Sequence, residues 1–442
     1  MSHLDTIYAL ASGHGKAGVA VFRISGARAL ELLRELGHPA PLKPRTATLV
    51  KISTRAGAPI DHALALAFPA PHSFTGEDVL EIHTHGSRAV IDLLLGTLQQ
   101  LPGLRLAEPG EFARRAFANQ KFDLLEAEGL ADLIDAETPA QHAQALRQLG
   151  GQMSARIAEL REAILIPLAL LEAYIDFPDE EIPEETLTET RDRIAALTGD
   201  IRALLDDGHL GERIRDGIEI VIFGPPNAGK SSLLNTLAKR DVAIVSDEPG
   251  TTRDLLEVHL NLDGYAVTLV DTAGLREASG SIEAEGIRRA HHRMQKAVLK
   301  LAVFDIVTAP EQYREFQALI DQNTLVILNK SDLADTPHSL VFDTHISTLS
   351  GEGIDHLITL LRDRLRDLIP GGASAAPVIT RARHRAAFTH ALAALERFTT
   401  DAGLELMCEE LRHAAQEIGK ITGKITTDDL LDVVFSRFCI GK

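Results

Sequence analysis

The run "IEIVIFGPPNAGKSSLLNTL", which begins at Ile218, constrains the fold of this chain more than any other feature. A β-rich apolar segment precedes Gly224, and four residues separate Gly224 from Gly229. Lys230 and Ser231 follow and open a helical pattern. In a phosphate loop of this kind, glycines let backbone N–H groups surround phosphate, the lysine neutralises the β and γ phosphates, and the serine offers a hydroxyl to Mg²⁺. The sequence therefore predicts a mainly parallel α/β domain that binds a nucleoside triphosphate.

Three downstream segments indicate that the nucleotide is GTP. "GTTRD" supplies Thr251 and Thr252 as candidates to contact the γ-phosphate and Mg²⁺, and "VTLVDTAG" ends a strand with Asp271. "LVILNKSD" ends at Asp332, whose carboxylate can accept two hydrogen bonds from guanine, a pattern that adenine does not supply. Each segment alone is weak, but their order after the phosphate loop predicts GTP binding. The predicted GTP-binding residues are Asn227, Ala228, Gly229, Lys230, Ser231, Ser232, Ser246, Asp247, Glu248, Pro249, Gly250, Thr251, Thr252, Asp271, Thr272, Ala273, Gly274, Asn329, Lys330 and Asp332.

The residue after this second segment departs from a Ras-type switch. Leu275 stands where Ras carries the glutamine that orients the attacking water, and leucine cannot do this. We expect another group to polarise the water, and Glu283 is the candidate. The alternative is that Glu283 is one more surface acid beside Glu277 and Glu285.

The pattern along the chain predicts a fold of α/β plus α class. The first part mixes strand-like and helical pieces, and the next is helical, with an apolar stripe that includes Ile194, Leu197 and Ile201. Strands and helices then alternate, and the helical pattern returns after the linker "GGASAAP", with Cys408 expected as a buried structural thiol. The predicted domains are an N-terminal α+β domain (1–118), a helical domain (119–215 with 379–442) and an inserted Ras-like P-loop GTPase domain (216–378).

The composition limits the partners and the compartment. The formal charge of −18 argues against a protein that holds nucleic acid mainly by general electrostatics, so an RNA partner would need a local basic surface or a second protein. Two cysteines in 442 residues fit a reducing compartment. The N-terminus does not have the pattern of a signal peptide, and the longest apolar stretch, "AILIPLALLEA", is too short to span a membrane. We therefore expect a cytoplasmic protein without a membrane partner.

Three other motifs are weaker candidates. "GHGKAG" matches a dinucleotide fingerprint, but a β-branched run follows it where a helix is required. His83 and His85 share one side of a strand, yet no third metal ligand is evident, so we expect two satisfied histidines. The terminal "CIGK" has a cysteine at the prenylation position, but its last two residues match that signal poorly.

With these motifs placed, the chain resembles the tRNA-modification GTPase family called MnmE or TrmE over essentially its whole length. The resemblance rests on "GVAVFRISG", "GEDVLEIHTHG", "PGEFARRAFANQKFDLLEAEGLADLI", "AYIDFPDEEI", "GPPNAGKSSLLN", "GTTRD", "DTAGLRE" and the terminal "FCIGK". It implies an N-terminal domain that binds tetrahydrofolate and dimerises, followed by a helical domain with an inserted G domain. It also implies that the chain works with the flavoprotein MnmG to add an aminomethyl-type group to carbon 5 of the wobble uridine of certain tRNAs.

The same resemblance implies cofactors and site residues. GTP would be the substrate, with Mg²⁺, K⁺ and a 5-formyl- or methylene-tetrahydrofolate as cofactors. The folate contacts would be Arg23, Glu81, Lys121 and Lys442. The K⁺ ligands would be Asn227, Ser246, Glu248 and Thr251, and the Mg²⁺ ligands Ser231 and Thr252. Glu283 would position the attacking water.

The family also implies assembly and a role for the C-terminus. It forms a homodimer through its N-terminal domain, a transient dimer of G domains and a heterotetramer-type complex with MnmG. If the tail packs against the folate site, Cys439 is a candidate catalytic thiol held near the one-carbon unit. The alternative is that Cys439 is a small apolar anchor for the tail.

Two departures and two rival functions stay open. Lys300 falls in a strand that should be apolar, where a charge is costly unless it reaches solvent, and Thr348 and Leu349 stand where the family's guanine loop usually has Ser-Ala-Lys or Ser-Ala-Arg. A regulatory or ribosome-assembly GTPase would share every G-domain motif but would not need Arg23, Glu81, Lys121 or the cysteine tail. A folate-dependent one-carbon enzyme merely regulated by GTP is the second alternative.

Overall fold

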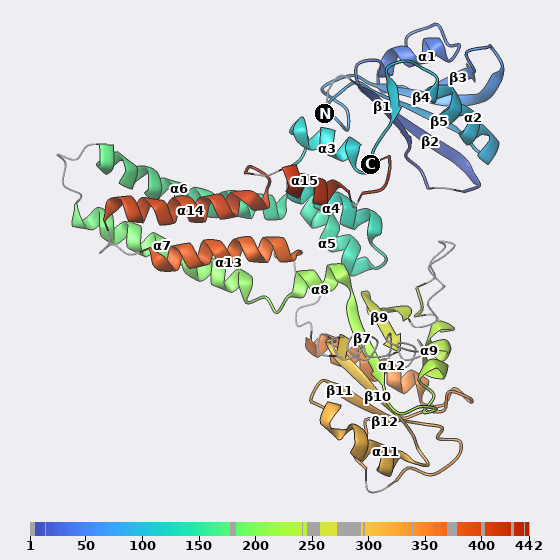
Figure 1. Ribbon diagram of the computed structural model, residues 1–442, viewed down its shortest axis with the longest axis vertical. Helices are drawn as coiled ribbons and strands as arrows, with labels where there is room; N and C mark the ends of the chain where they lie inside the picture. The colour runs from blue at the N-terminus through green and yellow to red at the C-terminus, as the bar shows by residue number, and fades with distance from the viewer. Residues whose placement is uncertain are drawn as a thin grey trace, which may run out of the picture. The chain divides into compact units, whose positions relative to one another are not determined.

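The computed structural model describes residues 5–13, 15–176, 183–240, 242–244, 257–271, 293–294, 297–337, 340–368, 378–398, 403–425, 428–436 and 438–441 (Figure 1). Contacts within the chain divide it into two compact units. Unit 1 consists of Met1–Ala131, Gln148–Arg191 and Ala394–Lys442, and unit 2 of Asp132–Arg147 and Asp192–Ala393. Each unit is described by itself, and the division into three domains at 118, 215 and 378 stays a prediction.

Unit 1 contains a six-stranded sheet in the order β3-β4-β5-β2-β1-β6, antiparallel except for the β1–β6 pair. Its elements are β1 (Thr6–Leu10), β2 (Ala17–Ser25), a 3₁₀ turn (Ala29–Glu31), α1 (Leu32–Glu35), β3 (Thr48–Ser53), β4 (Pro59–Phe68), β5 (Val79–Gly86), α2 (Arg88–Gln99) and β6 (Leu104–Leu106). One face is buried along the sheet, with Phe22, Ile24 and Ile82 in its core. At β1 the other face is covered as well, where Ile7 and Ala9 pack with Phe112 of α3. The helix α2 packs against β4 and β5, and Ser87 caps it by accepting a hydrogen bond from Val90 N.

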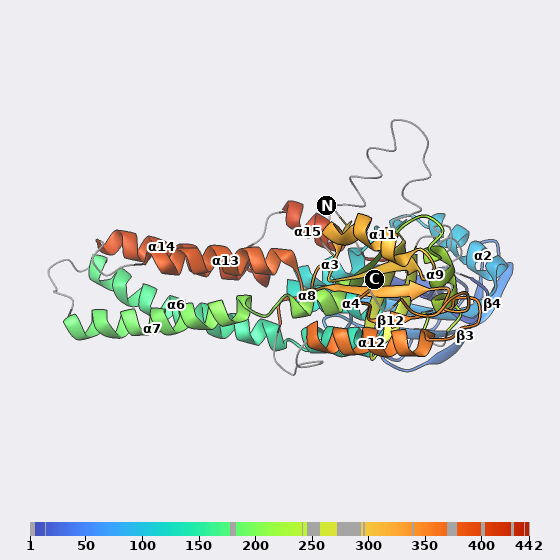
Figure 2. The same cartoon turned by 90° about the horizontal axis from the view of Figure 1, so that it is seen from below.

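Helices form the rest of unit 1 and run into unit 2. The helices with residues in unit 1 are α3 (Glu111–Ala118), α4 (Leu124–Asp135), α5 (Pro139–Leu149), α6 (Gln152–Asp176), α7 (Glu184–Leu205), α13 (Ala382–Arg397), α14 (Leu404–Ile421) and α15 (Asp428–Phe435). The helices α6 and α14 lie side by side (Figure 1 and Figure 2). The helix α15 packs against α3 through a cluster that includes Ala113, Leu124 and Phe435. Among the described helices, none is both long enough and apolar enough to cross a bilayer.

Unit 2 contains a second sheet in the order β12-β11-β10-β7-β9-β8, parallel except for the β8–β9 hairpin. Its elements are α8 (Leu210–Asp216), β7 (Ile218–Phe223), α9 (Lys230–Ala238), β8 (Glu257–Leu262), β9 (Tyr265–Asp271), β10 (Leu299–Asp305), α11 (Ala309–Phe316), a 3₁₀ turn (Gln317–Leu319), β11 (Thr324–Asn329), β12 (Thr344–His345) and α12 (Ile354–Leu368). The helices α9 and α12 share one core with the sheet, and α11 packs on the other face. The predicted fold class, with a P-loop α/β domain between helical segments, is confirmed.

The charge of Lys300 is satisfied within the protein. Its side chain is nearly buried in β10, and Nζ lies 2.7 Å from the carboxylate of Asp321 and donates to the carbonyl of Leu319. Burial raises the pKa of Asp321, but hydrogen bonds from Lys300 and Thr324 outweigh it and leave the pKa below the ordinary value. The pair therefore stabilises the fold above the ordinary carboxyl range, and this contribution is lost as the pH falls through the lowered pKa. The lysine charge in β10 is therefore paired inside the protein and is not exposed to solvent.

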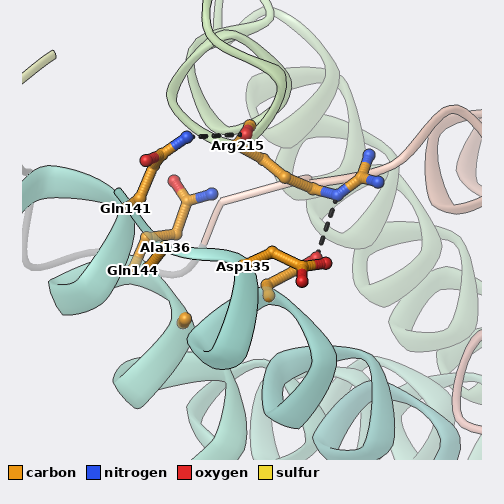
Figure 3. Close-up of a pocket in the computed structure, with 7 residues that line it drawn as sticks. Asp135, Ala136, Gln141, Gln144 and Arg215 are labelled. Carbon is orange, nitrogen blue, oxygen red and sulfur yellow. Dashed lines mark hydrogen bonds and ion pairs between the residues drawn. The ribbon is translucent and has the colours of Figure 1, made fainter. Parts of the chain in front are cut away.

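The segments that lead into and out of the second sheet meet at Asp132. Its carboxylate oxygen Oδ1 accepts from Arg215 Nε at 3.1 Å, just before β7, and from Arg381 Nη2 at 2.7 Å, just before α13. A cavity of about 90 Å³ beside this joint is shown in Figure 3, where Gln141 donates to the carbonyl of Arg215. Gln144, also on its wall, donates to the carbonyl of Gly211 in α8. The cavity has room for a few waters and is smaller than a typical ligand pocket, so we read it as part of the joint.

We expect Asp132→Ala to open this joint. Removing one partner of a buried ion pair costs about 3–5 kcal/mol, and here both arginines lose the acceptor that they share. Cleavage by trypsin after Arg381 should therefore accelerate on the order of 100- to 1,000-fold. Asp335→Ala, a change of an exposed carboxylate elsewhere in unit 2, is the control and should leave cleavage near the wild-type rate. Unchanged cleavage of Asp132→Ala would contradict the role given to this residue.

Candidate functional site

The phosphate loop lies between β7 and α9. Lys230 is buried, and its Nζ donates to the carbonyls of Gly224 at 3.0 Å and Pro225 at 2.7 Å. The hydroxyl of Ser231 donates to Asp271 Oδ2 at 2.8 Å, which joins the start of α9 to the end of β9. A hydroxyl beside a carboxylate at this point supplies the oxygen ligands that Mg²⁺ prefers next to phosphates. The residues therefore fit a magnesium-bound nucleotide.

Asn329 joins the phosphate loop to the loop between β12 and α12 (residues 346–353). It is fully buried at the end of β11, where Nδ2 donates to the carbonyl of Ala228 at 2.9 Å and Oδ1 accepts from Thr348 N at 3.3 Å. Gly229 has φ of 94°, and a Cβ atom there would lie 2.1 Å from Asn329 Nδ2. A glycine is therefore required at this close approach.

The carboxylate of Asp332, just after β11, is held by Ser347 of the loop between β12 and α12. Ser347 Oγ donates to Asp332 Oδ1 at 2.5 Å, and Lys330 Nζ pairs with Asp305 at 2.6 Å. The unusual residue Thr348 still donates to Asn329, because the donor is its backbone N–H, which any non-proline residue supplies. Leu349 is 87% exposed and contributes little to the loop's packing. The geometry of the loops thus accommodates both unusual residues.

Several predicted residues fall outside the described part of the chain. These are Ser246, Asp247, Glu248, Pro249, Gly250, Thr251, Thr252, Thr272, Ala273, Gly274, Leu275, Glu283 and Lys442. Their roles as switch, K⁺, water-positioning and folate residues stay predictions. The described part of the chain includes the phosphate loop, Asp271 and the loops that follow β11 and β12.

A second group of predicted residues meets in unit 1. Arg23 and Glu81 are direct partners on β2 and β5, with Arg23 Nε 3.0 Å from Glu81 Oε1. The guanidinium of Arg23 lies 5.0 Å from the ring centroid of Phe74. Phe74 in turn lies 6.1 Å from the ring of Phe122, beside Lys121, whose Nζ donates to the carbonyl of Pro71. The structure therefore brings Arg23, Glu81 and Lys121 around one loop.

The C-terminal tail reaches the same place. Arg23 Nη1 donates to the carbonyl of Gly441 at 3.4 Å, and Gly110 N donates to the carbonyl of Cys439 at 3.5 Å. Phe438 is buried, while the thiol-bearing Cys439 is exposed. The tail is thus packed beside Arg23. Cys408 is buried, as predicted for a structural thiol, and burial raises its pKa.

An ionic network behind this site was missed by the sequence analysis. Arg115 binds Glu77 and Glu111, and Arg105 binds Glu111 through two short contacts, 2.6 and 2.8 Å. Burial alone would raise the pKa of Glu111, but hydrogen bonds from Arg105 and Arg115 hold it below its ordinary value. The i,i+4 spacing of Glu111 and Arg115 within "EFARRAF" was the local signal available. The network fixes α3 to the sheet below the tail.

The two histidines of β5 each have a carboxylate partner. His83 Nε2 lies 3.5 Å from Glu81, and His85 Nδ1 lies 2.9 Å from Asp61. No group of three metal-binding side chains occurs among the residues that the structure describes. These contacts agree with the expectation of two satisfied histidines.

Comparisons with known proteins extend over both sites. A family model described as the MnmE helical domain matches residues 124–439, and one described as the GTP-binding protein TrmE N-terminus matches residues 6–121. The tRNA modification GTPase MnmE of Paramagnetospirillum magneticum is 50% identical over 444 residues, or 99% of this chain and 100% of the relative. The chain belongs to the MnmE family of tRNA modification GTPases.

Other MnmE proteins agree with this assignment. The MnmE proteins of Parvibaculum lavamentivorans and Rickettsia bellii are 50% and 45% identical, each over 99% of this chain and 100% of the relative. Among solved structures, the FeoB G domain of Methanococcus jannaschii is 25% identical, with a TM-score of 0.24, over 34% of this chain and 98% of that chain. The predicted family is confirmed, and so is the prediction of a GTPase that acts in tRNA modification.

We expect Asp332→Asn to weaken GTP binding at least about tenfold, because an acceptor facing guanine becomes a donor and a bond to a charged group contributes about 1.5–3 kcal/mol. Titration with a fluorescent GTP analogue measures this loss, and xanthosine triphosphate should bind the variant better than GTP does. Ser347→Ala, which removes the hydroxyl that holds Asp332, should show a smaller loss without the change in base preference. Equal affinity of Asp332→Asn and the wild type for GTP would refute the assignment.

Proposed function

We propose that this MnmE-family GTPase, together with the flavoprotein MnmG, adds an aminomethyl-type group to carbon 5 of the wobble uridine of certain tRNAs. The one-carbon unit would come from a 5-formyl- or methylene-tetrahydrofolate. The observation that carries the proposal is the contact of Arg23 with both Glu81 and the carbonyl of Gly441, two residues from Cys439. A plain regulatory GTPase has no evident use for a cysteine tail packed beside a charged pair in its N-terminal part.

The residues around Arg23 suit a reduced folate. A pterin-like ring offers N–H groups to a carboxylate, the role proposed for Glu81, and a flat face to Phe74. Arg23, Lys121 and Lys442 would favour the anionic and polar groups of the ligand. Bound folate would supply the one-carbon unit, and the protein's part is to hold it beside the exposed thiol of Cys439.

The GTP site is proposed to work with two cations. Ser231 and Thr252 would ligate Mg²⁺ beside Asp271, in keeping with the bond between Ser231 and Asp271. Asn227, Ser246, Glu248 and Thr251 would hold K⁺. Asn227 is exposed on the loop with a φ of 62°, so its side chain is available to a ligand. Glu283 is proposed to orient the attacking water in place of the glutamine that Leu275 replaces.

The sheet of unit 1 offers support for a homodimer. Val19 on β2, Leu49 on β3 and Leu64 on β4 are large, exposed apolar side chains, and Leu49 and Leu64 are cross-strand partners. By the alternation of β4 and β5, Leu64 shares its face with Glu81 and hence with Arg23. We propose that a second copy covers this face, that the G domains dimerise transiently, and that the complex with MnmG forms in the cytoplasm.

We expect Cys439→Ser to lose most tRNA modification while GTP hydrolysis continues. Serine keeps the size of the side chain but raises its pKa far above that of the thiol, so the change tests nucleophilicity more than packing. The measurement is the modified-nucleoside content of tRNA beside phosphate release by the same purified variant. Cys439→Ala is the matched control, since a mere anchor would let both variants keep most activity. Full modification by Cys439→Ser would favour the regulatory-GTPase alternative or an anchoring role.

We also expect K⁺ to accelerate GTP hydrolysis and Na⁺ to do so poorly. A cation beside the transferring phosphoryl group would offset the charge that an arginine finger offsets elsewhere, a role worth roughly 10³–10⁵ in rate. Turnover in matched K⁺ and Na⁺ buffers measures the effect, and Asn227→Ala should remove most of it. Equal turnover in the two buffers would exclude the K⁺ site.

A further inference from the structure

The backbone at Gly441 has no room for a side chain. Its φ is +103°, and a Cβ atom there would lie 2.5 Å from the carbonyl oxygen of Leu10 and 2.9 Å from Cα of Ala11. Both of these are backbone atoms at the end of β1, so no flexible side chain can move aside to relieve the contact. The tail can approach the sheet this closely only with glycine at this position.

A matching close approach occurs at the other end of the tail. Gly110, directly before α3, has a φ of +68°, and a Cβ atom there would lie 2.2 Å from the carbonyl oxygen of Phe435. The N–H of Gly110 donates to the carbonyl of Cys439, and Arg114 pairs with Asp432 of α15 at 2.7 Å. The last turn of α15 therefore rests on the start of α3 at a fixed distance.

Cys439 lies between these two fixed points. On one side Phe438 is buried in the cluster shared by α3, α4 and α15. On the other side Gly441 meets Leu10 and accepts from Arg23. Between them the side chains of Cys439 and Ile440 are exposed, so neither holds the tail by packing. The position of the thiol is set by the backbone on both sides of it.

We propose that Gly110 and Gly441 are positioning residues that seat the tail and place the Cys439 thiol beside the Arg23–Glu81 pair. This rests on the proposed role of Cys439 in tRNA modification, and adds that the alignment of its thiol depends on two glycines, which have no side chain to act on a substrate. A side chain at either position would lift the tail and move the thiol without changing its chemistry.

Semisynthesis tests the close contact of Gly441 with Leu10, which we call the glycine seat, because a peptide that begins with Cys439 can be joined to a protein thioester. A thioester of residues 1–438 is joined to Cys-Ile-Gly-Lys, to the same peptide with L-alanine in place of glycine, and to the peptide with D-alanine. D-alanine favours positive φ and directs its methyl group away from the position of the L-side Cβ atom. We expect the L-alanine protein to lose tRNA modification at least about tenfold and the D-alanine protein to recover most of it. GTP hydrolysis, measured on each product, checks that unit 2 is intact.

Release of the last residues by a carboxypeptidase is the second measurement, since a seated tail is protected and a lifted one is not. The L-alanine protein should be trimmed faster than the glycine protein when each rate is divided by that of the matching free tetrapeptide. Equal trimming of the glycine and L-alanine proteins, together with equal modification by all three proteins, would overturn the proposal. If Cys439→Ser kept full modification while L-alanine still accelerated trimming, the catalytic role of Cys439 would fall and the glycine seat would stand.

Two recombinant variants complete the test. Gly110→Ala should lower modification and speed trimming as the L-alanine protein does. Gly403→Ala is its matched control, because Gly403 also precedes a helix but has a φ of −60° and meets only a side-chain atom of Glu405. Ile440→Ala, a change of an exposed tail residue, should leave both readouts unchanged. A loss in Gly403→Ala or Ile440→Ala equal to that in Gly110→Ala would mean that the effect is not specific to the seat, and would overturn the proposal.

Discussion

The guanidinium of Arg23 is the interaction on which the site in unit 1 depends. It bonds to Glu81 on the neighbouring strand, lies over the ring of Phe74 and donates to the carbonyl of Gly441. These partners come from a strand, a loop and the last turn of the chain. A largely buried charge is stable while its hydrogen bonds are complete, and hydrogen bonds to charged groups are among the stronger ones. Docking of the tail and the geometry of the charged pair therefore support each other.

Asn329 has the corresponding role in unit 2. Its side-chain amide donates to the carbonyl of Ala228 in the phosphate loop and accepts from the N–H of Thr348 in the loop after β12. These two hydrogen bonds hold the two loops in a fixed position relative to each other. Asp132 holds together the two segments that enter and leave the second sheet, since Arg215 before β7 and Arg381 before α13 donate to the same carboxylate oxygen. The P-loop strand β7 starts three residues after Arg215. A shift of the backbone before β7 would therefore disturb the bond of Asp132 to Arg381 as well as its bond to Arg215.

The fold class and the nucleotide loops could be predicted because their signals are local. Apolar runs, turn glycines and the spacing of Gly224, Lys230 and Ser231 all lie within one strand–loop–helix unit. The joint could not be predicted in this way, because Asp132 lies 83 residues from Arg215 and 249 from Arg381. The partner of Lys300 could not be predicted either. The sequence indicated only that burying this charge in a strand would be unfavourable, and the pairing of β10 with β11 is what brings Asp321 to it. The tail depended on a resemblance, since nothing in "FCIGK" itself points to Arg23.

Both candidate sites use backbone contact to position their reactive groups. At Gly224 the phosphate loop approaches the backbone carbonyl of Val303, and at Gly441 the tail approaches the backbone carbonyl of Leu10. A contact made through side chains can relax by a change of rotamer, but a contact between backbone atoms shifts only if an element moves. The cost of a small misplacement is large where reacting atoms must be aligned, since about 1 Å can cost on the order of 100-fold in rate. Glycine at these points therefore gives the thiol and the phosphate loop a position that the flexibility of their own side chains does not determine.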